Sequence, residues 1–157
     1  MTTAIQTPET LIDGPFGARL LIEADGFSLV EHPIAPHTLA GPSHVHERED
    51  EYSYVLEGEV GFEVGDDLFS AGPGQLVAKP RGIWHAFWNA GDQPARVLEV
   101  ISPAGFERYF AEMAELLPPA VPEPDLAGLA ALQERYGLEM DFGSIERLSR
   151  EHGPGSP

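Results

Sequence analysis

The chain has 157 residues, of which 42% are apolar, a length and composition that suit one domain with one sizeable core. Its formal net charge of −17 argues against nucleic acid and membrane as partners, because anionic surfaces would be repelled. Cysteine is absent, which excludes disulfides and thiolate metal ligands. The sequence shows neither a secretion-signal pattern nor an apolar run near the roughly 20 residues that span a bilayer, and we expect a cytoplasmic protein.

Short β-type runs fill the chain from Ala18 to Ser102. Turn signals such as Asp25-Gly26 and Gly65-Asp66 separate them. Runs of this length at this spacing are typical of an all-β sandwich or barrel. The expected strands cover residues 19–23, 27–30, 51–56, 60–64, 68–69, 76–79, 85–89 and 96–101.

A helical segment is predicted after Pro103. Apolar side chains recur there at three- and four-residue spacings, the pattern of an amphipathic helix over residues 105–117. The proline-rich stretch 117–124 predicts a stiff extended linker. The apolar stripe consists of Phe106, Tyr109, Phe110, Met113 and Leu117.

Two further helices are predicted beyond the linker. Asp125 can cap a helix that Gly137 ends, and Ser144 can cap a third helix that ends before Gly153. These segments have too few apolar residues for a core of their own, so we expect them to pack on the barrel or on a partner subunit. The expected divisions are a β-barrel over residues 1–103, a helical C-terminal extension over 104–152 and a disordered tail over 153–157.

The stretch from His44 to Glu51 carries the first candidate site residues. Residues two apart on a strand point to the same face, so His44 and His46 aim their imidazoles the same way. Glu51 opens the next expected strand and can add a carboxylate oxygen beside them. Imidazole and carboxylate together suit a divalent transition metal such as Fe, Mn, Ni, Cu or Zn, and not calcium.

His85 is the fourth candidate ligand. It begins an expected strand after a turn shaped by Pro80 and Gly82, and Phe87 should face the same interior. Taken singly, each candidate ligand has a simpler interpretation: the histidines can be hydrogen-bonded core residues, and Glu51 can be an acidic side chain in a solvated loop. The remaining histidines, His32, His37 and His152, have no such context and receive no role.

The two stretches together resemble the two motifs of the cupin superfamily. One residue separates His44 from His46, four separate His46 from Glu51, and six separate Glu51 from Gly58. The second motif is matched in full by Gly74, Pro80, Gly82, His85 and Asn89, with intervals of five, one, two and three residues. One departure is Thr38, where the family often has glycine. The resemblance implies an all-β, double-stranded β-helix (jelly-roll) barrel whose metal ion is held by His44, His46, Glu51 and His85.

Within that superfamily the chain resembles small single-domain quercetin-dioxygenase-like cupins. The resemblance implies a homodimer and a metal-dependent dioxygenase that acts on a small, mostly apolar or aromatic, metal-chelating substrate, with Glu51 as catalytic base. The same barrel hosts other functions, so two alternatives stay open. One is a redox-neutral isomerase, lyase or polyketide cyclase, and the other is a non-catalytic small-molecule-binding protein.

The strand pattern also predicts a substrate pocket. Val55 and Phe87 lie on the parity of the ligands, and Phe62 and Trp84 are expected to join them on the inner wall. Tyr54 and Trp88 fall on the opposite parity and are assigned to packing or an interface. An aromatic wall suits a flat apolar substrate, although these side chains can equally be core filling.

Overall fold

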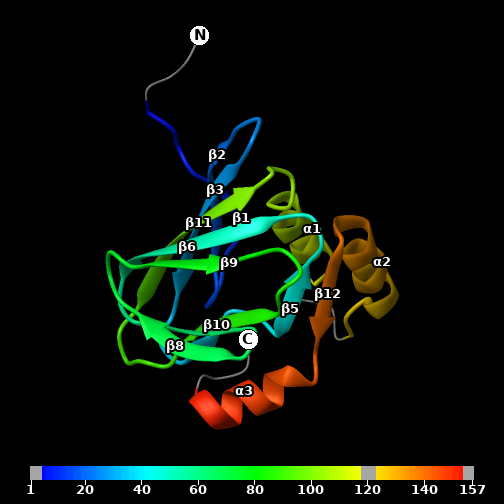
Figure 1. Ribbon diagram of the computed structural model, residues 1–157. Helices are drawn as coiled ribbons and strands as arrows, with labels where there is room; N and C mark the ends of the chain where they lie inside the picture. Colours follow the sequence, from blue (N-terminus) through cyan, green and yellow to red (C-terminus); the bar gives the residue numbers. More distant parts are fainter. Residues whose placement is uncertain (1–4, 118–122, 154–157) are drawn as a thin grey trace.

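Two antiparallel sheets face each other in the computed structural model, which describes residues 5–117 and 123–153 (Figure 1). The first sheet has the order β1 (Glu9–Ile12), β2 (Ala18–Glu23), β3 (Ser28–Ile34), β11 (Ala95–Ser102), β6 (Asp50–Glu57), β9 (Leu76–Lys79). The second has the order β12 (Leu138–Asp141), β5 (Ser43–His46), β10 (His85–Asn89), β7 (Val60–Val64), β8 (Asp67–Ala71), and β4 (Thr38–Leu39) pairs with β10. The expectation of an all-β, jelly-roll fold with a helical C-terminal extension is confirmed, in the form of a mainly β sandwich of two antiparallel sheets.

The inward face of the first sheet is divided between an apolar and a polar end. Strand β11 lies between β3 and β6 and buries every second residue, as an alternating pattern requires. Val97 lies opposite Val55 and closes one end with aliphatic side chains. At the other end, Glu99 lies opposite Ser53, and Glu51 opposite Lys79, all buried. The polar end is therefore available for chemistry.

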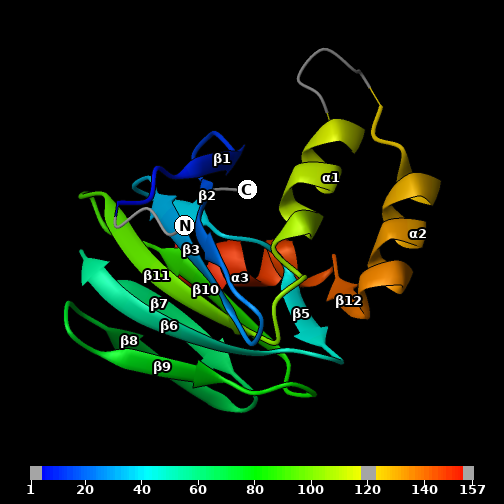
Figure 2. The same cartoon turned by 90° about the horizontal axis from the view of Figure 1, so that it is seen from above.

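Three helices follow the barrel strands: α1 (Arg108–Leu116), α2 (Leu126–Tyr136) and α3 (Ser144–His152). Helices α1 and α2 lie side by side, beside one end of the sheets (Figure 2). Asp125 caps α2 as expected, accepting a hydrogen bond from the backbone N–H of Gly128 at 2.8 Å. Gly137 ends α2 in the left-handed conformation, with φ of 63°. No described helix is long and apolar enough to cross a membrane.

Ser144 does not cap α3, which corrects the expectation. It is the first helical residue, and its hydroxyl donates to the Asp141 carbonyl and accepts from the Ser43 backbone N–H, at 2.6 and 2.7 Å. The hydroxyl thus joins the helix to β5. Residues 118–122 and 154–157, which hold most of the expected linker and tail, lie outside the described residues.

The extension also contains a strand that the sequence analysis did not predict. Strand β12 pairs antiparallel with β5, with Leu138 opposite His46 and Met140 opposite His44. The backbone of the histidine-bearing strand is thereby held between β10 and β12. Core contacts join extension and barrel: Phe106, Tyr109, Phe110, Leu132 and Leu138 pack in one cluster with Leu11, Leu20, Val30 and Ile101.

Candidate metal centre

Four side chains from three strands meet at the polar end of the sandwich. One ligand atom from each of His44, His46, Glu51 and His85 lies within 4.8 Å of the other three. Strand β5 supplies the first two, β6 supplies Glu51, and β10 supplies His85, which lies directly opposite His44 in the β5–β10 pair. The Glu51 carboxylate is 3.2 Å from His85 Nε2 and 3.4 Å from His46 Nε2.

Backbone carbonyls orient two of the three imidazoles. The Nδ1 of His44 is 2.8 Å from the Pro42 carbonyl, and the Nδ1 of His85 is 3.2 Å from the Ile83 carbonyl. A carbonyl oxygen can only accept, so each Nδ1 carries the hydrogen and each Nε2 keeps its lone pair. An outer partner that fixes the tautomer in this way is usual for histidines that bind metals.

The donor set fits a bound cation. The Nε2 atoms of His46 and His85 are buried and have no hydrogen-bond partner among the described residues. Unpaired buried polar atoms are costly, and an ion at the centre would satisfy both. Three imidazoles and one carboxylate are ligands that divalent transition metals prefer.

Burial and neighbouring charges shift the pKa values of the candidate ligands in different directions. Burial and the neighbouring His85 and His46 hold the pKa of His44 well below its usual range. Burial opposes ionisation of Glu51, but His46 and Lys79 outweigh it and hold the pKa of Glu51 well below its usual range. Burial likewise opposes protonation of His46, yet the charge of Glu51 and the contact with Glu49 raise its pKa to about 9.

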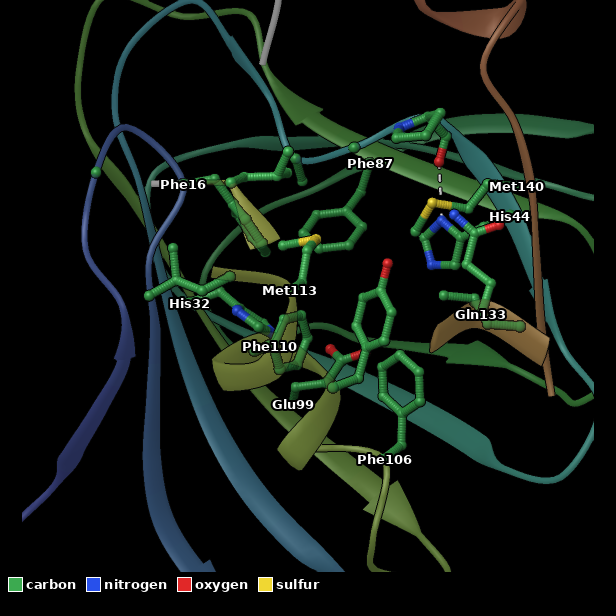
Figure 3. A pocket seen from close by; sticks show the side chains of 18 of the residues that line it. Phe16, His32, His44, Phe87, Glu99, Phe106, Phe110, Met113, Gln133 and Met140 are labelled. Atoms are coloured by element: carbon green, nitrogen blue, oxygen red, sulfur yellow. Dashed lines mark hydrogen bonds between the residues drawn. The ribbon is translucent and has the colours of Figure 1, made fainter. Parts of the chain in front are cut away.

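A cavity of about 430 Å³ opens beside the ligands (Figure 3). Its walls are mostly aromatic and aliphatic, and both barrel and extension contribute to them. Met140 of β12 and Gln133 of α2 lie on the side of His44, whereas Phe16 and Met113 lie across the cavity. Other lining residues are His32, Phe87, Glu99, Phe106 and Phe110. The extension therefore forms part of the site.

Of the four expected pocket residues, Phe87 lines the cavity and three do not. Val55 faces inward but lies in the apolar end of the sandwich, fully buried in a core cluster. Phe62 stacks on Phe87 with ring centroids 5.8 Å apart and belongs to the same core. Trp84 precedes β10 and is 37% exposed. Strand parity predicts which face a residue occupies, but not its depth along the barrel.

Tyr54 and Trp88 lie outside the cavity, as their parity predicts. Tyr54 is partly exposed on the outer face of β6. Trp88 is buried on the outer side of β10, where its ring stacks on His152 of α3 with centroids 4.3 Å apart. His152 therefore has a packing role that the sequence did not reveal.

Sequence reasoning missed two charged residues of the cavity, Lys79 and Glu99. The Lys79 ammonium forms an ion pair with Glu99 and lies 3.3 Å from Glu51 Oε2. Burial would lower the pKa of Lys79, but Glu51 and Glu99 outweigh it and raise that pKa above its usual value. Burial raises the pKa of Glu99 to about 7. The available signal was Glu99 itself, a charged residue between the apolar positions 97 and 101 of an alternating strand.

Comparison with known proteins places this architecture in a family. Residues 31–101 match the model of the cupin domain. Among solved structures, TT1209 from Thermus thermophilus is similar, with a TM-score of 0.53 and 28% identity over 56% of this chain and 83% of that chain. No match was found among curated proteins.

Two further solved structures share the fold at lower identity. A cupin-superfamily sugar phosphate isomerase from Silicibacter pomeroyi has a TM-score of 0.53 and 24% identity over 57% of this chain and 60% of that chain. A predicted oxalate decarboxylase from Thermotoga maritima has a TM-score of 0.54 and 23% identity over 62% of this chain and 92% of that chain. Motif spacing, sandwich topology and the domain match agree that residues 31–101 of the chain form a cupin domain.

Proposed function

We propose that this protein is a metal-dependent enzyme, a dioxygenase, that acts on a small, mostly apolar substrate able to chelate the metal through oxygen. One observation carries the proposal: the His44, His46, Glu51 and His85 cluster adjoins a cavity of about 430 Å³ with largely apolar walls, which His44 and Glu51 help to line. A concave apolar site with a few convergent polar groups is the usual form of a small-molecule site. When bound, the metal would supply Lewis-acid polarisation of a substrate oxygen and, if redox-active, electron transfer to dioxygen.

Glu51 is the residue best placed to move a proton. Its carboxylate is buried on the cavity wall, so it is positioned to accept the proton of a substrate hydroxyl as that oxygen approaches the centre. The aromatic rings of Phe16, Phe87 and Phe110 would then hold the substrate and exclude water from the reacting carbon.

A redox-neutral reaction is the second candidate, and the Lys79–Glu99 pair favours it. Isomerases, lyases and cyclases need groups that give and take protons, and this buried pair lies in the same cavity as Glu51. The names sugar phosphate isomerase and predicted oxalate decarboxylase occur among structures of this fold, although at 24% and 23% identity they share only the fold with this chain.

The experiment is a turnover assay of the Fe-, Mn- and Ni-loaded protein with flavonols, catechols and 1,3-diketones, in air and under nitrogen. The dioxygenase proposal predicts that turnover requires dioxygen. Glu51→Gln should abolish turnover while keeping part of the metal, whereas the control Glu47→Gln, an exposed neighbour, should leave turnover unchanged. Turnover that persists under nitrogen, with a product of unchanged mass, would overturn the dioxygenase in favour of the redox-neutral candidate. Tight binding without turnover in either gas would instead favour a binding protein.

A further inference from the structure

We propose that Lys79 recognises an anionic oxygen, so that the cavity selects an apolar molecule with an anionic head group. The head group would be a carboxylate, enolate or phenolate beside the metal centre, and the apolar body would extend toward Phe16 and Met113. This inference rests on the proposed function, because it assumes that the cavity beside the ligands is the substrate site.

One N–H group of the Lys79 ammonium is available to a ligand. Its ammonium carries three N–H groups, of which Glu99 takes one and Glu51, at 3.3 Å, can take a second. Among the described residues, no further oxygen or nitrogen atom contacts the ammonium to take the third. Lys79 is only 1% exposed and lines the cavity, so bulk water does not solvate this donor freely. A ligand oxygen in the cavity would satisfy it.

The ammonium is also held in place, as a specificity residue must be. One oxygen of Glu99 contacts Lys79, and the other accepts a hydrogen bond from the Ser53 hydroxyl at 2.5 Å. The face of the Phe87 ring lies 4.6 Å from the nitrogen, close enough for a cation–π contact. The three supporting residues come from three different strands, which leaves Lys79 little freedom to move away.

Local charge favours an anionic group beside Lys79. Glu51 is the one carboxylate among the four candidate ligands of a divalent ion, so an oxygen placed between that ion and the Lys79 ammonium would face positive charge on both sides. Glu49, another buried carboxylate near these ligands, lies 3.6 Å from His46 Nδ1 and does not line the cavity. Among the described residues that line the cavity, Lys79 alone carries an amine or guanidinium, so the position of the anionic group is defined.

The test compares phenylacetate with its neutral isostere phenylacetamide. Binding to the zinc-loaded protein is measured by calorimetry at pH 8, above the pKa of about 7 for Glu99. Zinc is redox-inactive, so the readout does not depend on turnover. We expect the wild type to prefer phenylacetate by about tenfold or more, as a charge-assisted hydrogen bond implies. Lys79→Met should reduce the preference to about twofold or less with one zinc still bound per chain. The control Arg19→Met removes an exposed charge and should keep the full preference.

A double variant controls for misfolding that an unpaired Glu99 could cause in Lys79→Met. Lys79→Met/Glu99→Gln removes the ion pair as a unit, leaves no unpaired buried charge and preserves the formal net charge. It should bind zinc and lack the preference for phenylacetate. A double variant that still prefers phenylacetate would show that the metal alone selects the anion, and would overturn the proposal. Absence of phenylacetate binding to the wild type would overturn it as well. A wild type that binds phenylacetate selectively but turns over none of the candidate substrates would contradict the proposed function and leave this inference supported.

Discussion

Of the four candidate ligands, His85 is the one whose removal should weaken metal binding most directly. It is the only one of the four supplied by β10, its Nδ1 is fixed by a backbone carbonyl, and its Nε2 has no partner in the described part of the chain. We predict that His85→Ala weakens metal binding by about 100-fold or more, since even the loss of an outer-shell partner typically costs 10–100-fold. Elemental analysis after dialysis measures this. The exposed His37→Ala is the control, and equal metal content in both variants would contradict the assignment.

His32 should make the fold sensitive to acid. It is buried between the rings of Phe16 and Phe110, its Nδ1 donates to the Gly17 carbonyl at 2.9 Å, and burial lowers its pKa from 6.5 to about 4. Below pH 6.5 the unfolded chain binds a proton at His32 that the folded chain does not bind. The free energy of unfolding therefore decreases as the pH is lowered from about 6.5 to about 4.

The variant His32→Phe isolates this effect, because it keeps an aromatic ring but cannot titrate. Between pH 7 and pH 4.5 the wild type should lose about 2 kcal/mol more of its free energy of unfolding than the variant does. Urea unfolding of the metal-free proteins at both pH values measures the difference. Parallel losses in the two proteins would show that His32 does not titrate as described.

At the scale of residues, sequence spacing predicted which four candidate ligands lie close together, but it did not predict the residues that surround them. His44, His46, Glu51 and His85 follow motif intervals, and the structure brings them together. The Lys79–Glu99 pair follows no interval, because its members meet through the cross-strand neighbours of β6, β9 and β11. Only the order of strands in the sheet shows that they are partners.

Among the elements, β12 has the most direct influence on the ligands after the strands that carry them. It pairs along β5, and the Gly137 carbonyl just before it accepts a hydrogen bond from the Glu47 N–H at 2.9 Å, one residue beyond His46. Sequence reasoning found the helix stop at Gly137 but not the strand. A four-residue segment gains its strand conformation from its neighbour in the sheet, and its own pattern is too short to reveal this.

Gly137→Ala should therefore loosen the metal centre as well as the fold. The residue has φ of 63°, and an added Cβ would lie 3.0 Å from Arg48 Nε. We predict a loss of about 1 kcal/mol or more in unfolding free energy, together with weaker metal binding, because β12 shifts against β5. Gly153→Ala is the matched control: it also ends a helix at positive φ, but its Cβ meets no atom within 4 Å. Metal affinity unchanged in both variants would show that β12 does not support the ligand strand.

For the whole molecule, the expectation of a homodimer stays a prediction, and the sheet edges suggest where it would form. Strands β8 and β9 are the last strands of their sheets and carry Leu68 and Leu76, which are 59% and 60% exposed. Unpaired edges with exposed apolar side chains favour association. The net charge of −17 opposes it, so the dimer should strengthen as salt rises.

Sedimentation equilibrium at low and high salt tests this prediction. We expect a dimer that Leu76→Lys converts to a monomer, whereas Leu126→Lys, an exposed leucine of α2, leaves it intact. A wild type that is monomeric at every salt concentration would contradict the homodimer.

The overall architecture was largely visible in the sequence, since turn signals and alternation predict most of the sandwich strands. What the sequence could not show is that the extension closes the cavity. That follows from where α1, α2 and β12 dock, with Met113, Gln133 and Met140 all reaching the same space. Docking of this kind depends on contacts between segments far apart in the chain, such as the cluster that joins Phe110 to Leu11.

The measurement that tests the metal centre most directly is X-ray absorption at the metal edge of the loaded protein, combined with an anomalous-difference map from its crystals. We predict one ion per chain with imidazole nitrogens and one carboxylate oxygen at about 2.0–2.2 Å, surrounded by His44, His46, Glu51 and His85. An anomalous peak elsewhere, or a first shell without imidazole scattering, would contradict the account.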